Sequence, residues 1–489
     1  MTTSRRAAAP TGQGLASQVS VSGLPTVVEA VAAFGSRTLS PVELTDLVLE
    51  RIERLDPLVE AYVDVYAEHA RTQARQAEAA IGRGEALGPL HGVPVTLKDL
   101  FDVAGRPTMA GSAIREGHRA ATDSEVTRRL RAAGAIILGK VVTHEFAFSV
   151  LSLPTRNPWN LAAAPGGSSG GSAAAVSAEL CLASIGSDTG GSIRMPAGLT
   201  GLVGLKPTYG RVSKRGVVPL SWSLDHTGPI TRTVADAAVV FSSIAGHDPA
   251  DPCSINEPLS DCLGHLDGGV EGLRIGVPRN FFFDLVDPEV GDAVHAALDV
   301  LVDAGASLVE IEVPDVELAA DCVSTVVGVE AAAVHQHDVR TTPQLYTAST
   351  RQEILAGELI AGTTYVNAQR VRQLVAEGFR SALSVVDVLA TPTLPVTAPA
   401  YGAETTLLGG QEVGVLTALS RATAPANAVG LPALALPCGF ASNGLPISLQ
   451  FVGRPFDEAT ILRAGQAYQR HTHWHTFRPP LADCVSPPT

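Results

Sequence analysis

The strongest constraint on the fold is an order of segments that occurs more than once along the chain: an amphipathic helix, a glycine and a short apolar run. Residues 124–133 and 288–304 have apolar side chains at helical spacing, and each segment ends at a glycine. The apolar runs 135–138 and 307–313 follow directly. Glycine commonly ends helices because it adopts left-handed backbone conformations without strain, and short, continuously apolar runs are typical of buried strands. This alternation predicts an α/β fold with a largely buried sheet.

The elements near the N-terminal end lead to the first lysine of the chain. A capping box with proline at the first helical position spans residues 40–43 and predicts a helix that stops at Asp56-Pro57. Residues 61–82 are predicted to form a polar, alanine-rich helix, and the apolar run 95–97 predicts a strand that ends at Lys98. Arginine is the usual cation of this chain, so a lysine is a better candidate for chemistry, because only lysine loses its proton near neutral pH.

Composition argues against several classes of protein. A formal net charge of -14, without a block of lysine and arginine, disfavours a phosphate-binding face, so we expect no direct nucleic-acid partner. The six cysteines are scattered without CxxC spacing, and we interpret them as free thiols rather than a disulfide framework or a zinc module. No run of 18 or more uncharged apolar residues occurs, so no membrane segment and a cytoplasmic location are expected.

A glycine- and serine-rich segment, residues 165–207, carries the candidate chemistry. Flexible linkers are monotonous and polar, whereas this segment encloses the apolar stretch 173–185. It contains neither GxxxxGK[ST] nor GxGxxG, the patterns of phosphate-binding loops. Glycines can also aim backbone N–H groups at a developing oxyanion. The segment that fits this role best is Thr189, Gly190, Gly191 and Ser192.

These stretches resemble the amidase signature family. The resemblance rests on GVP-x-x-LKD at residues 92–99, GGSSGGS at 166–172, D-x-GGSIR-x-P-A at 188–197 and GLKPT-x-G-R at 204–211. It covers nearly the whole chain between about residues 28 and 478. Such a long combination is very specific.

The resemblance implies the overall organisation. We expect a single domain over residues 28–478, with a large mixed twisted sheet covered by helices on both faces. An N-terminal tail, 1–27, and a C-terminal tail, 479–489, would flank it. The family implies no metal or cofactor, a small-molecule amide as the substrate, and a homodimer as a candidate assembly.

The resemblance also implies a Ser-Ser-Lys triad. Ser192 corresponds to the nucleophile, Ser168 to the proton relay on a cis peptide bond, and Lys98 to the base. The chemistry needs these residue types: serine attacks only when a base removes its proton, and a hydroxyl can both accept and donate a proton. Lysine is a base only when neutral, so Lys98 must be buried and have a pKa lowered by roughly 3 units from ~10.4. The predicted reaction is hydrolysis of an amide through an acyl-serine intermediate.

Supporting residues surround this triad in the sequence. Asp188 and Arg194 stand on either side of Ser192, and we expect them to pair and to brace the loop rather than to act in catalysis. Ser169, beside the relay serine, is a further supporting residue. Apolar walls favour a small aryl or alkyl amide. The residues predicted to form that wall are Phe146, Phe148 and Trp222.

Two alternatives come from the same residues without the family. Residues 167–171 match the GxSxG nucleophile elbow with Ser169 at its centre, and a late histidine would complete that triad. The alternation His471, His473 and His475 could instead present three imidazoles to a metal, although a polar surface segment is the favoured interpretation.

Two further alternatives lie within the family. The chain could be the glutaminase subunit of a tRNA-dependent amidotransferase, or a hydrolase of carbamates, ureas or esters. Apolar candidates for the pocket favour a free-standing amidase over a glutaminase. We also expect residues 281–380 to contribute to the acyl pocket or its lid, while the aromatic residues Phe281 to Phe283 could equally belong to the core.

Overall fold

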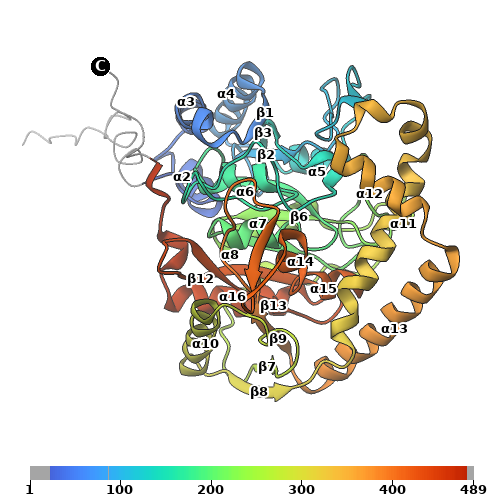
Figure 1. Ribbon diagram of the computed structural model, residues 1–489. Coiled ribbons are helices and arrows are strands. Elements are labelled where there is room, and N and C mark those ends of the chain that lie inside the picture. Colours follow the sequence, from blue (N-terminus) through green and yellow to red (C-terminus); the bar gives the residue numbers. More distant parts are fainter. Residues whose placement is uncertain (1–22, 86, 482–489) are drawn as a thin grey trace, which may run out of the picture.

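The computed structural model describes residues 23–85 and 87–481 (Figure 1). Its centre is a mixed sheet of 11 strands in the order β1-β3-β2-β4-β6-β5-β12-β13-β9-β7-β8, and a separate hairpin joins β10 to β11. The strands are β1 Tyr62–Val65, β2 Pro94–Lys98, β3 Ile136–Val141, β4 Ala183–Asp188, β5 Val203–Lys206, β6 His226–Thr231, β7 Arg274–Pro278, β8 Ser307–Ile311, β9 Val388–Pro392, β10 Thr405–Leu408, β11 Gln411–Gly414, β12 Ala433–Phe440 and β13 Pro446–Val452. The prediction of an α/β fold with a large mixed sheet flanked by helices is confirmed.

Helices pack around this sheet, and α11, α12 and α13 lie together along one side of the molecule (Figure 1). The helices are α2 Val27–Ser36, α3 Pro41–Val59, α4 Ala67–Arg83, α5 Glu125–Ala132, α6 Gly170–Ser177, α7 Arg194–Leu199, α8 Val234–Ile244, α9 Cys262–His265, α10 Pro288–Asp303, α11 Ala319–Thr341, α12 Ala348–Glu358, α13 Gly362–Val385, α14 Val415–Ser420, α15 Ala424–Ala428 and α16 Glu458–His471. The helix-then-strand order predicted for the segments after residues 124 and 288 is present as α5 with β3 and α10 with β8.

The sheet brings the lysine and the glycine- and serine-rich segment together. Strands β2 and β4 are parallel neighbours, and Leu97 lies opposite Ile185. Carboxyl ends of parallel strands meet at the same edge of a sheet. Lys98 at the end of β2 therefore lies beside Ser187 and Asp188 at the end of β4.

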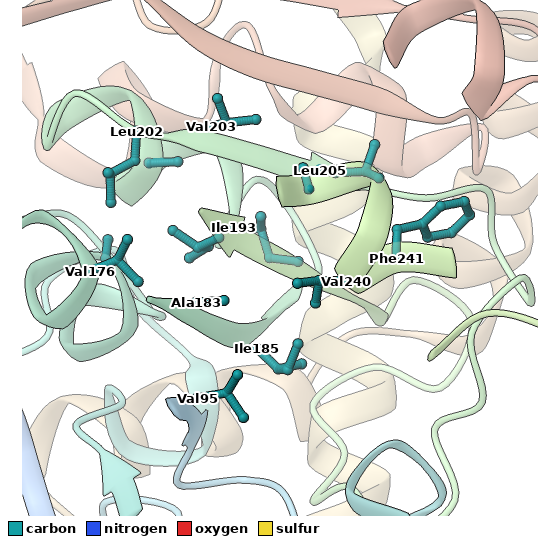
Figure 2. Packing of buried hydrophobic residues seen from close by; sticks show 14 of the residues in the cluster. Val95, Val176, Ala183, Ile185, Ile193, Leu202, Val203, Leu205, Val240 and Phe241 are labelled. Atoms are coloured by element: carbon teal, nitrogen blue, oxygen red, sulfur yellow. The ribbon is translucent and has the colours of Figure 1, made fainter. Parts of the chain in front are cut away.

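An apolar core fixes the segment that follows Ser192. Figure 2 shows side chains of β2, β4, β5, α6 and α8 gathered around Ile193. The central strands β2 to β6 are buried at every residue, whereas the edge strands β1 and β8 are partly exposed. The expectation of a largely buried sheet therefore holds for the centre and not for the edges.

Two sequence-based boundaries near the N-terminal end are wrong. Helix α3 continues through Pro57 to Val59, because Val59 is fully buried and the helix ends only at Glu60, which has a left-handed backbone. Just beyond the helix, the backbone N–H groups of Ala61 and Tyr62 donate hydrogen bonds to the Asp56 carboxylate. Residues 62–65 form strand β1 rather than the start of a helix, since they pair with the edge of β3.

The predicted tails are also too long. Thr26 and Glu29 form a capping box at the start of α2, and Leu24 and Val27 are buried in the main core, so residues 23–27 belong to the folded part. Leu481 is buried in the same core. The rest of the two tails, residues 1–22 and 482–489, lies outside the described residues.

Among the described helices, only the stretch Val316–Thr341, which contains α11, is long and apolar enough to cross a membrane by length and composition. Its 18-residue window has a mean hydropathy of 1.3, and 44% of that window is buried inside the molecule. The helix packs against α12, α13 and α15, and core helices of folded proteins meet the same criterion.

Candidate active site

Lys98 is fully buried at the end of β2 and has two hydroxyl partners. Its Nζ lies 2.7 Å from the Oγ of Ser168 and 2.9 Å from the Oγ of Ser187. Burial lowers the pKa of Lys98 to about 7, although the negative charges of Asp225 and Asp188 oppose this shift. A neutral lysine is therefore available near pH 7, as the chemistry of a serine nucleophile requires.

Ser168 is fully buried beside the lysine, and the N–H of the next residue, Ser169, donates to the carbonyl oxygen of Ser192 at 3.3 Å. The peptide bond between Gly167 and Ser168 is cis. The Ser152 hydroxyl donates to the carbonyl oxygen of Ser168 at 2.9 Å and accepts a hydrogen bond from the N–H of Gly170. These contacts hold the backbone of Ser168 on both sides, so that its hydroxyl remains directed at Lys98.

Ser192 and the residues before it leave several polar groups free. The Ser192 hydroxyl has no hydrogen-bond partner among the described residues, and Ser192 lines a cavity. The backbone N–H groups of Gly190, Gly191 and Ser192 likewise have no hydrogen-bond partner among the residues that the structure describes. Free N–H groups beside a free hydroxyl are what an oxyanion hole needs.

The packing of this loop requires a glycine at residue 191. Gly191 has a φ of 137°, and a Cβ atom there would lie 2.2 Å from the Thr423 Oγ1. The Thr423 hydroxyl in turn donates to the carbonyl oxygen of Gly190 at 2.7 Å. The loop therefore has no room for a side chain at residue 191.

Three strand glycines form a socket for Ile193, the residue after Ser192. They are Gly186 on β4, Gly204 on β5 and Gly228 on β6. A Cβ atom at each would approach a side-chain carbon of Ile193 to between 3.1 and 3.3 Å. Since Ile193 is fully buried, this socket fixes the chain just beyond the Ser192 hydroxyl.

Asp188 and Arg194 pair as predicted and are both fully buried. Two guanidinium nitrogens lie 3.1 Å from the two carboxylate oxygens. Arg194 also donates to Gln450 and Asn427, and Asn427 donates back to Asp188. Burial alone would raise the pKa of Asp188, yet the charge and hydrogen bonds of Arg194 hold it well below its ordinary value. The pair braces the loop and contacts no cavity.

Sequence reasoning missed Ser187, the second partner of Lys98. A serine at the end of a strand carries no signal of its own, and only the register between β2 and β4 places it beside the lysine. Ser169 holds the backbone of Ser187: its hydroxyl donates to the Ser187 carbonyl oxygen at 3.1 Å and accepts from the Ser187 N–H. Ser169 is thus a supporting residue.

This position of Ser169 argues against the nucleophile elbow. Its hydroxyl is fully buried and occupied, and Ser169 lines neither cavity of the site. The late histidines lie elsewhere: His471 contacts the carbonyl oxygen of Ala467, and His475 lines a separate surface cavity with Arg232 and Arg478. Residues 23–85 and 87–481 contain no group of three or more histidine, cysteine, aspartate or glutamate side chains that could hold a metal ion.

The Ser192 cavity has a volume of about 210 Å³, and its walls combine apolar with polar side chains. Phe148 lines it, as predicted, together with Met195 and, from α11, Val323 and Val327. Residues 281–380 therefore do contribute to the pocket wall, and Glu353 of α12 also lines it. Phe281 and Phe282, in contrast, are buried in a core cluster.

The other two predicted wall residues lie outside this cavity. Phe146 is only 3% exposed, and its ring packs on His335 and Tyr346 behind the wall. Trp222 is 59% exposed and lines a second cavity of about 260 Å³. The two cavities share Ala147 and Leu220, and the second one reaches Ser187. Residue type alone could not distinguish a wall from the layer behind it.

Comparisons with known proteins show the family to which the chain belongs. The family model described as Amidase matches residues 43–462. An amidase of Pseudomonas putida is 46% identical over 93% of this chain and 98% of its own length. A glutamyl-tRNA(Gln) amidotransferase subunit of Chloroflexus aggregans is 42% identical over 94% of this chain and 98% of its own length. A solved bacterial aryl acylamidase of the amidase signature enzymes has a TM-score of 0.85 at 27% identity, covering 92% of this chain and 97% of that one. The chain belongs to the amidase signature family, whose members are hydrolases of carbon–nitrogen bonds other than peptide bonds.

Proposed function

We propose that the protein is a free-standing amidase that cleaves a small, apolar aryl or alkyl amide through an acyl-serine intermediate. The observation that carries this proposal is the contact of 2.7 Å between the buried Lys98 and Ser168, next to a loop that exposes the Ser192 hydroxyl and three free N–H groups. These groups support the proposal, because they are the kinds of group that the chemistry requires.

The reaction proceeds in two steps. Ser192 Oγ attacks the amide carbonyl carbon while its proton passes to Ser168, whose own proton moves to the neutral Lys98. The N–H groups of residues 190–192 hold the oxyanion, and the tetrahedral intermediate collapses when the relay returns the proton to the leaving nitrogen. Water then attacks the acyl-serine ester with the same relay as the base, which releases the carboxylic acid and restores Ser192.

The cavity supports the choice of substrate. Among the described residues that line it there is no lysine, arginine or histidine, whereas Asp321 and Glu353 place two carboxylates on its wall. The α-carboxylate of glutamine would meet no cation there, whereas its α-ammonium group could pair with either acid. An uncharged amide with an apolar acyl group avoids the cost of an unpaired carboxylate.

A panel of amides, carbamates, ureas and esters with matched acyl groups tests the proposal. We expect the highest kcat/KM for an apolar aryl or alkyl amide, and no turnover by the Ser192→Ala variant. Hydrolysis of that amide by folded Ser192→Ala at the wild-type rate would refute the assignment of the nucleophile. A preference for carbamates, ureas or esters would keep the triad and change the substrate.

The second candidate function is that of a glutaminase subunit in a tRNA-dependent amidotransferase. The identity of 42% to such a subunit favours it. A glutaminase assay of the chain alone and with the other subunits of an amidotransferase separates the two functions. We expect no glutaminase activity in either case, and stimulation by the partner subunits would favour the second candidate.

A further inference from the structure

A buried carboxylate on helix α11 contacts the loop that follows strand β5. Glu330 is only 4% exposed and accepts four hydrogen bonds. One carboxylate oxygen accepts from the Ser221 hydroxyl at 2.5 Å and from the Ser223 N–H at 3.1 Å. The other accepts from the Ser223 hydroxyl at 2.7 Å and from the Tyr365 hydroxyl of α13 at 3.0 Å. Four donors satisfy the acceptor sites of a carboxylate, so no further ligand is needed to explain its burial.

The loop held by Glu330 leads directly to the oxyanion segment. The backbone N–H groups of Leu220 and Ser221 donate to one oxygen of Asp225, at 2.9 and 3.0 Å. The other oxygen of Asp225 accepts from the Thr189 hydroxyl at 2.6 Å. Thr189 precedes Gly190, so three hydrogen bonds, by way of Ser221 and Asp225, connect Glu330 to the residue before the free N–H groups.

Helix α11, which carries Glu330, also lines the Ser192 cavity. Val327 and Val323, about one and two turns before Glu330 on α11, line the Ser192 cavity. Arg372 of α13 adds a second attachment, because it donates to the Ser223 hydroxyl and to the carbonyl oxygen of Ala428. The wall of the cavity and the oxyanion segment are therefore held to each other through one loop, residues 221–225.

We infer that Glu330 is a positioning residue for the oxyanion hole, acting through Ser221, Asp225 and Thr189. This inference rests on the proposed function. Glu330 contacts neither the cavity nor the triad, and its effect is to fix where the N–H groups of residues 190–192 point. Misplacing such donors weakens transition-state binding and leaves ground-state binding almost unchanged.

The test compares Glu330→Ala with Glu330→Gln. Glutamine can keep all four contacts: its oxygen accepts from the Ser223 N–H and the Ser221 hydroxyl, and its NH2 group donates to the two other hydroxyls, whose oxygens can accept. We expect Glu330→Ala to lower kcat by about 10- to 100-fold with little change in KM, and Glu330→Gln to stay within about threefold of wild type. The best amide of the panel serves as substrate.

A trifluoromethyl ketone with the acyl group of that amide supplies a second readout. It forms a tetrahedral adduct with Ser192 and places an oxyanion among the N–H groups. Its affinity should fall in Glu330→Ala by the same factor as kcat. Should Glu330→Ala not fold, Ser221→Ala removes one link of the tether and should lower the affinity by about three- to tenfold.

Glu179→Ala is the matched control. Glu179 is equally buried, pairs with Arg51 and Arg478, and lines neither cavity. It should lower the free energy of unfolding without changing the ketone affinity of the folded enzyme. Unchanged kcat and ketone affinity in Glu330→Ala, or in Ser221→Ala if the former is unfolded, would overturn the inference. Absence of any ketone adduct in the wild type would instead contradict the proposed function itself.

Discussion

At the scale of single residues, the site depends on how one lone pair is oriented. A neutral lysine has two N–H bonds and one lone pair, and Lys98 has two hydroxyl partners. If one N–H donates to Ser187, the lone pair is free to accept the proton of Ser168. In the proposed mechanism Ser187 therefore orients the base, a role for which the sequence carries no pattern.

Ser187→Ala should lower kcat by roughly tenfold, about 1.4 kcal/mol in the barrier. It should also move the midpoint of the pH profile to lower pH, because a hydroxyl acceptor stabilises the charged lysine more than the neutral one. Ser184→Ala is the control, since Ser184 is buried on the same strand and lines neither cavity. A wild-type pH profile for Ser187→Ala would show that Ser187 does not orient the base.

The candidate residues differ in how far the sequence could identify them. Family resemblance suggested Lys98, Ser168 and Ser192 because each sits in a long motif. The pocket residues were inferred only from their apolar character, and of these Phe148 lines the Ser192 cavity whereas Phe146 lies behind its wall. An apolar side chain has the same character in a core as in a pocket. The amino-acid sequence therefore cannot show whether such a residue lines the cavity or lies behind its wall.

At the scale of elements, the glycines around Ser192 have different roles. A Cβ atom at Gly190 would meet only a carbon of Val323 at 3.8 Å, whereas one at Gly191 would clash with Thr423 and Met195. Gly191 also has a positive φ, which other residues rarely adopt. The first position thus faces the cavity, and the second lies within the packed loop.

Gly191→Ala should lower kcat by at least 100-fold, because the loop must move to accept the methyl group and carries the oxyanion donors with it. Gly190→Ala should retain kcat within about tenfold and should chiefly raise KM for large acyl groups, since the methyl group enters the cavity. Steady-state kinetics over an acyl-length series checks both variants. Equal losses in the two variants would contradict the distinction.

The elements themselves were predictable where local signals and tertiary packing agree. The capping box at residues 40–43 and the glycine after residue 133 mark real helix ends. The sequence-based predictions were wrong at Pro57 and at β1. Burial of Val59 extends the helix past Pro57, and pairing with β3 makes residues 62–65 a strand. Such long-range contacts leave no local pattern, and neither does the strand order.

At the scale of the whole molecule, the buried Asp188–Arg194 pair connects distant parts of the chain to the loop of Ser192. Arg194 donates to Asn427 on α15 and to Gln450 on β13, more than 200 residues away in sequence. Removing one member of a buried pair leaves an uncompensated charge. The Asp188–Arg194 pair therefore contributes both to the stability of the fold and to the geometry of the site.

Arg194→Met should lower the free energy of unfolding by about 3–5 kcal/mol. Arg274→Met, which breaks the partly exposed pair with Asp387, should cost no more than about 1 kcal/mol. Urea unfolding of the two variants at pH 7 makes the comparison. Similar losses in both would show that Arg194 does not stabilise the molecule through its buried network.

The proposed mechanism needs Lys98 as its base, and the pH dependence of acylation in wild type and Lys98→Arg is the decisive measurement. With a pKa of about 7, the wild-type single-turnover rate should rise about tenfold per pH unit below pH 7 and level off above it, as the lysine loses its proton. Arginine keeps the charge and titrates above ~12, so the variant should be slower by several orders of magnitude across this range. A Lys98→Arg enzyme that retains more than about a tenth of the wild-type rate, a barrier change below ~1.4 kcal/mol, would contradict the account.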